Sequence, residues 1–260
     1  MGKPVKVIEK AFHILEILSD EKTLSLKKIS EITKLPKPTA SRILDTMQGL
    51  GYIEQDSSTL QFQLGAKLLS LSRNNGSASE IITIAEPYLK KLYELFGETV
   101  NLARLHDSQI IYIRILESNN AFRFSDTIGD YASIHSTAIG KSLSAFLPED
   151  KLNELIEKCE FTSFTKKTIT DKEDLRRHLK QVRHEGYAID NEEGHDGVIC
   201  IGAPIFNKDN LPFAAMSISV PKVRCKSSTI QKLAREISKV SIQISLELGV
   251  TDIRKCLDGK

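Results

Sequence analysis

The chain has 260 residues, of which 40% are hydrophobic and 27% are charged, and its formal net charge is +2. This is ordinary for a globular protein of one large or two unequal domains, and so small a total charge does not by itself indicate a nucleic-acid partner. No apolar stretch approaches the ~20 residues of a membrane span. Charged side chains interrupt the first apolar segment, whereas the apolar region of a signal peptide is continuous. We therefore expect a cytoplasmic protein with no membrane partner.

The N-terminal part predicts three helices followed by a β-hairpin. A first amphipathic helix covers residues 5–18, Ser25 caps a short second helix, and residues 34–36 break it. A third helix runs from Pro38 to Leu50, where Gly51 suits a left-handed cap, and residues 52–64 alternate as a strand, a polar turn and a strand. One face of the first helix is apolar, with Ile8, Ala11, Phe12, Leu15 and Leu18.

This order of elements is that of a winged helix-turn-helix, whose third helix enters the DNA major groove by its N-terminal end. Residues 25–42 carry five basic residues and one acidic residue, a local charge of +4 in a chain whose total is +2. Short hydroxyls and an arginine suit contacts with base edges and phosphates. The predicted DNA-binding residues are Lys27, Lys37, Pro38, Thr39, Ser41 and Arg42. The alternative is a basic helical module that binds a protein.

The C-terminal part mixes antiparallel strand pairs with helices, which favours an α+β domain over a parallel βαβ array. Asn and Gly within residues 73–77 mark a linker, and a helix over 79–96 is expected to kink or restart near Pro87. The further strands are predicted at 99–105, 109–116, 198–206 and 213–220. The further helices are predicted near 139–146, 149–158, 172–184 and 227–248.

Three other sites can be considered in this part of the chain. The segment from Ile139 to Ser142 ends like a phosphate-binding loop, but His135 stands where such a loop needs glycine. Cys200, His135 and Asp190 are residue types of a nucleophilic or zinc site, yet no spacing brings them together. The four cysteines, Cys159, Cys200, Cys225 and Cys256, form no CxxC pair. We therefore predict no catalytic residues, no metal and no cofactor.

Several blocks of the sequence, in order, resemble the isocitrate lyase regulator (IclR) family. They are KAFHILEIL from Lys10, LSLKKISEITKLPKPTASRILDTMQGLGYIEQD from Leu24, FQLGAKLLSLS from Phe62, HSTAIGKSLSAFLP from His135, GYAIDNEE from Gly186, GVICIGAPIF from Gly197 and AAMSISVP from Ala214. Together they span most of the chain. The resemblance implies a winged helix-turn-helix over 1–73, a linker and connecting helix over 74–97, and a GAF-like effector-binding domain over 98–260, with an antiparallel sheet flanked by helices.

The resemblance also implies a pocket for a small metabolite, often one that bears a carboxylate. Ser217 and Ser219 lie two residues apart on a strand, so their side chains share a face; without the resemblance, a half-exposed strand face would explain them. Ala138 and Ile139 are bulkier than is usual in the family, which leaves the size of the pocket open. The effector-binding residues implied are Phe124, Ala138, Ile139, Asp190, Cys200, Ser217 and Ser219. The residues 191–193 are expected to be a solvated turn.

The predicted function is that of a transcriptional regulator, and not of an enzyme. The expected partners are a double-stranded DNA operator, a small effector that carries a carboxylate, and further copies of the chain in a homodimer or homotetramer. Whether the regulator represses or activates cannot be read from the sequence. The alternative is a metabolite-binding enzyme with a DNA-binding tail, but a convincing pair of general base and nucleophile is missing.

Overall fold

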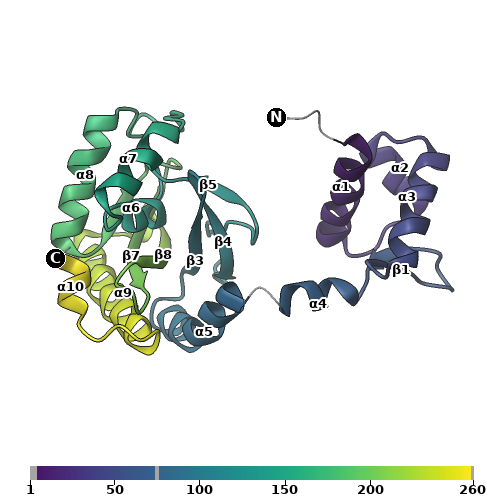
Figure 1. The fold of residues 1–260 in the computed structure, drawn as a ribbon. Coiled ribbons are helices and arrows are strands. Elements are labelled where there is room, and N and C mark those ends of the chain that lie inside the picture. The colour runs from purple at the N-terminus through teal and green to yellow at the C-terminus, as the bar shows by residue number, and fades with distance from the viewer. Residues whose placement is uncertain (1–4, 74–75, 259–260) are drawn as a thin grey trace. The chain divides into compact units, whose positions relative to one another are not determined.

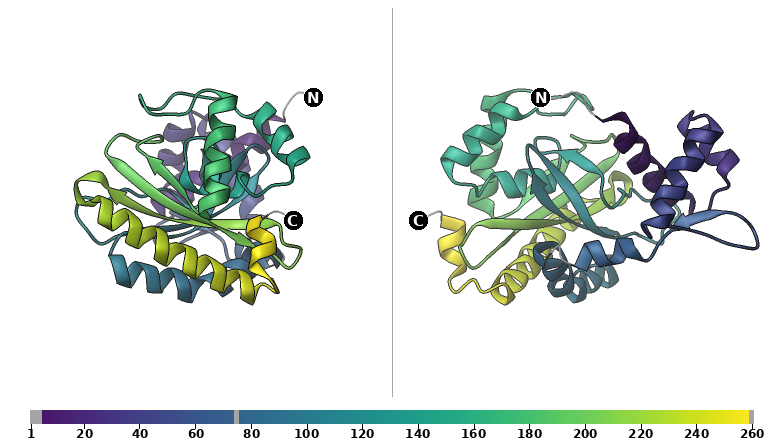
Figure 2. Two further views of the ribbon diagram at one scale, coloured as in Figure 1. Left: turned by 90° about the vertical axis from the view of Figure 1, so that its left-hand side faces the viewer. Right: turned by 45° about the vertical axis from the view of Figure 1, so that its right-hand side comes forward.

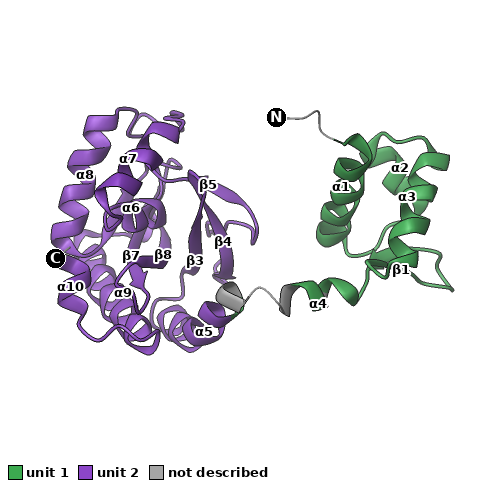
Figure 3. Ribbon diagram, in the orientation of Figure 1, with its two compact units in different colours: residues 1–79 green, residues 80–260 purple. Residues whose placement is uncertain are grey.

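The computed structural model describes residues 5–73 and 76–258, which form two compact units (Figure 3). The first unit covers residues 1–79 and the second covers residues 80–260. Asn74 and Asn75, within the predicted linker, lie outside the described residues. The division therefore separates the predicted DNA-binding elements from the predicted sensing elements, and each unit is described by itself.

The first unit has three helices, a two-stranded antiparallel sheet and a further helix (Figure 1). Between the second and third helices, Lys34 adopts the left-handed conformation with φ 53°, and the Ser30 hydroxyl donates to the Leu35 carbonyl at 2.6 Å, so the turn is tight. The elements are α1 (Lys6–Glu21), α2 (Leu26–Thr33), α3 (Lys37–Gly49), β1 (Ile53–Gln55), β2 (Phe62–Leu64) and α4 (Lys67–Arg73).

The core of this unit uses only part of the apolar surface of α1. Ile14, Ile17 and Leu18 of α1 are buried against α2, α3 and the small sheet. Ile8 and Phe12 stay 53% and 61% exposed, so part of the apolar face expected from the sequence lies outside the core. An exposed apolar face of this kind marks a surface that another partner can cover.

The second unit is built on a six-stranded sheet with the order β5-β4-β3-β8-β7-β6, in which every neighbouring pair is antiparallel. Its strands are β3 (Thr99–His106), β4 (Gln109–Leu116), β5 (Tyr131–Ser133), β6 (Ala188–Asn191), β7 (Val198–Phe206) and β8 (Pro212–Pro221). Its helices are α5 (Gly76–Phe96), α6 (Ala138–Ser144), α7 (Glu149–Lys158), α8 (Lys172–Glu185), α9 (Ser227–Glu247), α10 (Ile253–Asp258) and a short 3₁₀ turn, η1 (Lys222–Arg224).

Helices cover both faces of the sheet (Figures 1 and 2). Alternation along a strand sends successive side chains to opposite faces. Val100 and Leu102 of β3 therefore join the core shared with α5 and α9, whereas Ala103 packs in the cluster that contains α6. The predicted α+β architecture, with an antiparallel sheet flanked by helices, is confirmed.

The structure differs from the expected elements in a few places. The helix α5 continues through Pro87, although proline removes one helical hydrogen bond, because neighbouring residues such as Ala85 and Leu89 are buried in the core. The short strands β5 and β6 and the helix α10 were not predicted, since three to six residues carry too little periodicity to be recognised. No helix within the described part of the chain is long and apolar enough to cross a membrane.

Candidate DNA-binding surface and ligand cavity

The first turns of α3 present most of the predicted DNA-binding residues. Ala40, Ile43 and Leu44 anchor the helix in the core of the unit. On its other sides Lys37, Pro38 and Arg42 are exposed, and Thr39 and Ser41 are half-buried. Lys27 is exposed in the first turn of α2. A helix held in this way offers its N-terminal end and its polar side chains to a groove or to phosphates.

The hairpin β1–β2 is the wing, and its turn is held by one carboxylate. Asp56 Oδ1 accepts hydrogen bonds from the backbone N–H groups of Ser58 and Thr59 at 2.9 and 2.7 Å. These bonds and those from the two hydroxyls lower the pKa of Asp56 to about 2. Residues 53–64 contain no lysine or arginine. The wing strands and their turn therefore carry no lysine or arginine, whereas α2 and α3 carry Lys27, Lys28, Lys37 and Arg42.

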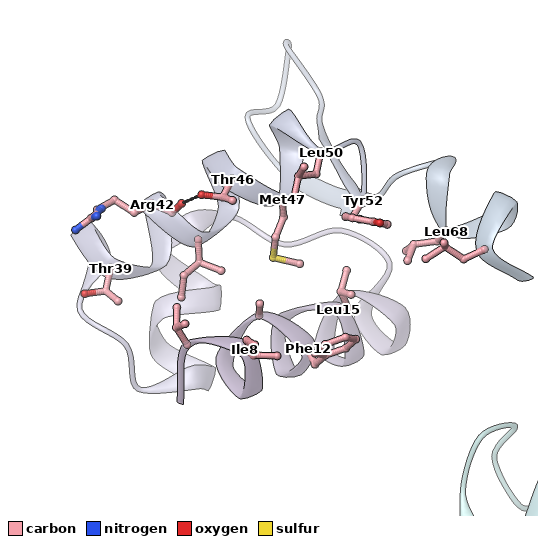
Figure 4. A pocket seen from close by; sticks show the side chains of 14 residues that line it. Ile8, Phe12, Leu15, Thr39, Arg42, Thr46, Met47, Leu50, Tyr52 and Leu68 are labelled. Carbon is pink, nitrogen blue, oxygen red and sulfur yellow. Dashed lines mark hydrogen bonds between the residues drawn. The ribbon is translucent and has the colours of Figure 1, made fainter. Parts of the chain in front are cut away.

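An apolar groove of about 600 Å³ runs between α1, α3 and α4 within this first unit (Figure 4). The exposed apolar face of α1 forms one wall. Met47 of α3, Leu50 directly after α3 and Leu68 of α4 form the other. Arg42 borders the groove at one end, where its guanidinium extends away from the apolar side chains (Figure 4). The sequence predicted the apolar face of α1 but not that α3 and α4 would complete a groove beside it.

A second cavity, of about 350 Å³, lies in the second unit between α6, the sheet and two loops. The loop before β5 and the loop between β6 and β7 contribute side chains, and the first turn of α6 forms one wall. The structure brings all of the residues predicted for an effector to this cavity: Phe124, Ala138, Ile139, Asp190, Cys200, Ser217 and Ser219.

The wall formed by the sheet is a small hydrogen-bond network. Asn101 of β3 is almost fully buried, and its Nδ2 donates to the hydroxyl oxygens of Ser217 at 3.3 Å and Ser219 at 3.1 Å. The Cys200 thiol donates to Ser219 Oγ at 3.3 Å. Asn101 was not predicted, because only the register that pairs β3 with β8 places it beside the two serines.

Two carboxyls also line the cavity, and one of them, Asp190 of β6, pairs with Cys200 in the sheet. Asp190 Oδ1 accepts hydrogen bonds from the N–H groups of Glu193 at 2.6 Å and Gly194 at 3.4 Å, and burial raises the pKa of Asp190 to about 7. Asp126 hydrogen-bonds the hydroxyl of Tyr112, and burial raises the pKa of this carboxyl as well. Asp126 and Tyr112 were not predicted from the sequence, since nothing in their spacing relates them to Asp190.

Two aromatic rings meet at the edge of this cavity. Phe124 and His195 come from different loops, and their ring centroids lie 4.6 Å apart. Both residues line the cavity, and of the two only Phe124 was predicted. Among the described lining residues there is no lysine and no arginine. A ligand therefore meets hydroxyls, carboxyls, aromatic surface and the imidazole of His195, but no lysine or arginine among the described lining residues.

A buried ion pair ties α6 to the loop after β6. Lys141 is 1% exposed, and its Nζ donates to Glu193 Oε2 at 2.5 Å and to the Ile189 carbonyl at 2.6 Å. The expected solvated turn at 191–193 is therefore wrong for Glu192 and Glu193, both of which are buried. Because the Lys141 ammonium is buried and hydrogen-bonded within the protein, it cannot bind a nucleotide phosphate as the lysine of a phosphate-binding loop does.

The residues weighed for a nucleophilic or zinc site do not assemble. His135 Nε2 donates to the Thr162 carbonyl at 3.0 Å, and its Nδ1 faces the thiol of Cys159, whose Sγ lies 3.5 Å away. The Cys200 thiol donates a hydrogen bond to Ser219 instead. Burial raises the pKa of Cys200 well above the usual range, so the thiol stays protonated. Within residues 5–73 and 76–258, no three side chains of His, Cys, Asp or Glu are grouped as metal ligands would be.

Comparison with known proteins finds matches along both units. The sequence model of the IclR helix-turn-helix domain matches residues 7–57, and that of the bacterial transcriptional regulator IclR C-terminal domain matches residues 76–246. The regulator KdgR of Escherichia coli K12 is 32% identical over 248 residues, which cover 95% of this chain and 94% of KdgR. The acetate operon repressor of Salmonella typhimurium is 29% identical, with 95% and 91% covered.

The fold has the same relatives. The crystal structure of the Thermotoga maritima IclR superimposes with a TM-score of 0.81 at 28% identity, and the match covers 94% of this chain and 99% of that one. The proteins that are similar over nearly the whole chain are transcriptional regulators and not enzymes. The enzyme considered as an alternative on the sequence has no support among them.

Proposed function

Because the chain belongs to the IclR family of bacterial transcriptional regulators, we propose that a small organic acid controls its binding to an operator and that it acts as a homodimer or homotetramer. The helix-turn-helix domain binds DNA, and the C-terminal domain is the effector domain. We assign DNA binding to residues 1–73, the connection to 74–97 and effector binding to 98–260. Since two relatives are named as repressors, repression is the mode of control we propose.

We assign operator contacts to Lys27, Lys37, Pro38, Thr39, Ser41 and Arg42. In support, the first turns of α3 are held by a buried face while the polar side chains stay accessible. Thr39 and Ser41 suit base edges or phosphates, and Arg42 can hold a guanine or a phosphate by two hydrogen bonds. Lys27 and Lys37 add positive charge beside the helix N-termini, which themselves favour phosphate.

The observation that carries the effector proposal is the single cavity in which all the predicted effector residues meet. Its volume, about 350 Å³, suits a small metabolite. We propose that the carboxylate lies between the first turn of α6, at Ala138 and Ile139, and the hydroxyls of Ser217 and Ser219. Asp190 then receives a hydrogen bond from a ligand hydroxyl or a water, and Cys200 and Phe124 enclose the body of the ligand.

For the homodimer, the support is the apolar groove of the first unit. Its exposed Ile8, Phe12 and Leu71 form a continuous surface with Leu50. A symmetric regulator contacts two half-sites with two recognition helices, so its DNA-binding units benefit from a contact with each other. We propose that the same groove of a second copy covers this surface.

Effector binding controls the operator affinity only if the protein has a conformation that binds the operator strongly and one that binds it weakly, and if these two conformations differ in affinity for the effector. A coupling free energy of about 1–3 kcal/mol is typical of such control. We propose that α4 and α5 transmit it, since these helices lead from the DNA-binding elements to the sheet.

The test is a selection of operator sequences from random duplexes with the full chain, followed by release of the selected duplex by small organic acids. We expect one preferred symmetric sequence, and release by at least one acid at a concentration that also raises the melting temperature of the free protein. The absence of any sequence preference would remove the regulator proposal. Sequence-specific binding that no acid changes would remove the effector proposal alone.

A further inference from the structure

We propose that the carboxyl of Asp126, positioned by the hydroxyl of Tyr112, is a second polar subsite of the cavity that accepts a hydrogen bond from the effector, so that the effector is a monocarboxylic acid with a hydroxyl group away from its carboxylate. This inference rests on the proposed effector function of the cavity and narrows the class of acid. Asp126 is the residue that determines specificity, and Tyr112 is a positioning residue.

The subsite lies apart from the serines and from Asp190. In the strand order of the sheet, β3 separates the β4 strand of Tyr112 from β8, and on the other side β7 separates the β6 strand of Asp190 from β8. Neighbouring strands lie about 4.8 Å apart, so β4 and β6 each lie roughly 10 Å from β8. Tyr112 and Asp126 nonetheless line the same cavity as Ser217 and Ser219. A ligand held at the serines can therefore meet a separate polar group on the β4 side.

The hydrogen bond between Tyr112 and Asp126 has a defined direction. Tyr112 is 6% exposed, and burial together with the nearby Asp126 raises the pKa of its hydroxyl, which therefore keeps its hydrogen and donates it. A carboxylate has two accepting oxygens and no hydrogen to donate. Among the residues that the structure describes, Tyr112 is the one side chain that hydrogen-bonds the Asp126 carboxyl. Asp126 consequently keeps acceptor capacity that a ligand in the cavity can use.

The surroundings of Asp126 support this accepting role. Burial raises the pKa of Asp126, whereas the bond from Tyr112 and the nearby His195 lower it, and Asp130 raises it again. His195 also packs against Phe124, which precedes Asp126 by two residues on the same loop, with ring centroids 4.6 Å apart. The loop that carries Asp126 is therefore held from β4 by Tyr112 and from the loop after β6 by His195.

An accepting carboxylate discriminates between the groups that an acid can carry at its far end. A methyl group leaves the carboxylate without a further partner, and a second carboxylate brings a like charge next to it. An ammonium group can donate, but it loses much more hydration than a hydroxyl does on entering a cavity. A hydroxyl donates at the lowest cost of desolvation. The subsite therefore favours a hydroxy acid over the corresponding unsubstituted acid, amino acid or dicarboxylic acid.

The experiment scans the distance between the two ends of the ligand. Each unsubstituted acid from propanoate to hexanoate is compared with the acids of the same length that carry a terminal hydroxyl, amine or second carboxylate, and benzoate is compared with 4-hydroxybenzoate. All are titrated by calorimetry into the full chain at neutral pH. We expect one hydroxy acid to bind about 10- to 100-fold more tightly than its unsubstituted acid, the usual gain for a hydrogen bond to a charged group. The dicarboxylate of that length should bind more weakly than either.

Variants separate a role in specificity from a structural role. Asp126→Ala should abolish the preference for the hydroxy acid, while the unsubstituted acid binds at least as well as to the wild type, because a negative charge beside it has been removed. Tyr112→Phe should reduce the preference in the wild-type background and should not change it further when Asp126 is already alanine. A merely structural Tyr112 would instead weaken both acids in both backgrounds. Asp209→Ala, at an exposed position between β7 and β8, is the matched aspartate control.

The outcomes distinguish this inference from the function on which it rests. Equal binding of hydroxy and unsubstituted acids at every length, tighter binding of an amino acid, or a preference that survives Asp126→Ala overturns the role of Asp126, while the cavity remains the site of an acid. If no acid of the series binds, the proposed small-acid effector itself fails, and the inference fails with it.

Discussion

Gly202 of β7 lies directly against the backbone of Ala138, the first residue of α6. A Cβ placed on Gly202 would be 2.8 Å from both the carbonyl carbon and the carbonyl oxygen of Ala138. The same glycine pairs in the sheet with Ser217. The absence of one side chain therefore allows the first turn of α6 to approach the serine wall of the cavity, and the two sides of the proposed effector site are set by this contact.

Gly202→Ala should consequently damage both stability and the cavity. Because the obstacle is backbone and not a flexible side-chain end, α6 must shift, and overpacking of this kind costs about 1–3 kcal/mol. We expect a melting temperature lower by several degrees and a loss of effector-induced stabilisation. Gly97→Ala is not a suitable control, since its φ is 66°; Gly49→Ala is suitable, because nothing lies within 4 Å of the added carbon. Equal small effects of both changes would contradict the prediction.

The buried pair of Lys141 and Glu193 leads to a second prediction. Lys141→Met removes the cation and leaves the carboxylate of Glu193 buried without its partner, which typically costs about 3–5 kcal/mol. The double variant with Glu193→Gln should recover part of this loss, because the uncompensated charge is then gone. Urea unfolding of the wild type, of Lys141→Met and of the double variant measures the loss of unfolding free energy and its partial recovery. A double variant that is no more stable than Lys141→Met would show that the pair acts through packing alone.

The raised pKa of Asp190 predicts that the stability of the protein depends on pH. Its pKa is raised from 3.8 to about 7 by burial, so the folded state disfavours the ionised form. The contribution of this group to stability is therefore complete below pH 3.8, decreases as the pH rises from there to about 7, and is constant above it. At about 1.4 kcal/mol per pKa unit, the whole change is about 4 kcal/mol. Lys141 and Glu193 are the charged groups that act on Asp190, with opposite signs.

The measurement compares the wild type with Asp190→Asn in urea between pH 4 and 7.5. Asparagine keeps an acceptor for the N–H groups of Glu193 and Gly194 but does not ionise. The difference in unfolding free energy between the two proteins should change in favour of the variant as the pH increases. A constant difference across this range would mean that Asp190 is ionised throughout.

The sequence indicated those parts of the site that depend on local order, and missed those that depend on strand register. Ser217 and Ser219 were identified through the resemblance to the IclR family, and alternation along one strand added that their side chains share a face. Asn101 lies 116 residues before Ser217, and only the pairing of β3 with β8 brings the two together. Glu193 was misjudged as solvated for the same reason, since its burial depends on Lys141 from another element.

Arg42→Ala should weaken binding to the selected operator by about 1–3 kcal/mol if Arg42 contacts a base, and should relax the preference at one position of each half-site. If Arg42 contacts only phosphate, affinity should fall similarly for all sequences and its dependence on salt should become less steep. Arg177→Ala, which removes one exposed positive charge from α8, is the control. Binding by fluorescence anisotropy at several salt concentrations separates these cases, and an unchanged affinity would remove Arg42 from the interface.

The groove of the first unit gives the last prediction. Phe12 is 61% exposed in the single chain, so Phe12→Asp should not unfold the unit, but in the proposed dimer it places a carboxylate in an apolar contact. We expect the operator affinity to fall at least tenfold, because half-sites that are read independently lose the advantage of an intramolecular second contact. His13→Asp adds the same charge at the next position of α1, outside the groove, and should bind DNA normally. Crosslinking through a cysteine introduced at Ile8 reports the groove directly, independently of the oligomeric state of the second unit. We expect efficient crosslinking when the introduced cysteine is the single change, and its loss when Phe12→Asp is added. Equal operator affinity of the two aspartate variants would instead show that this surface is not a contact between copies.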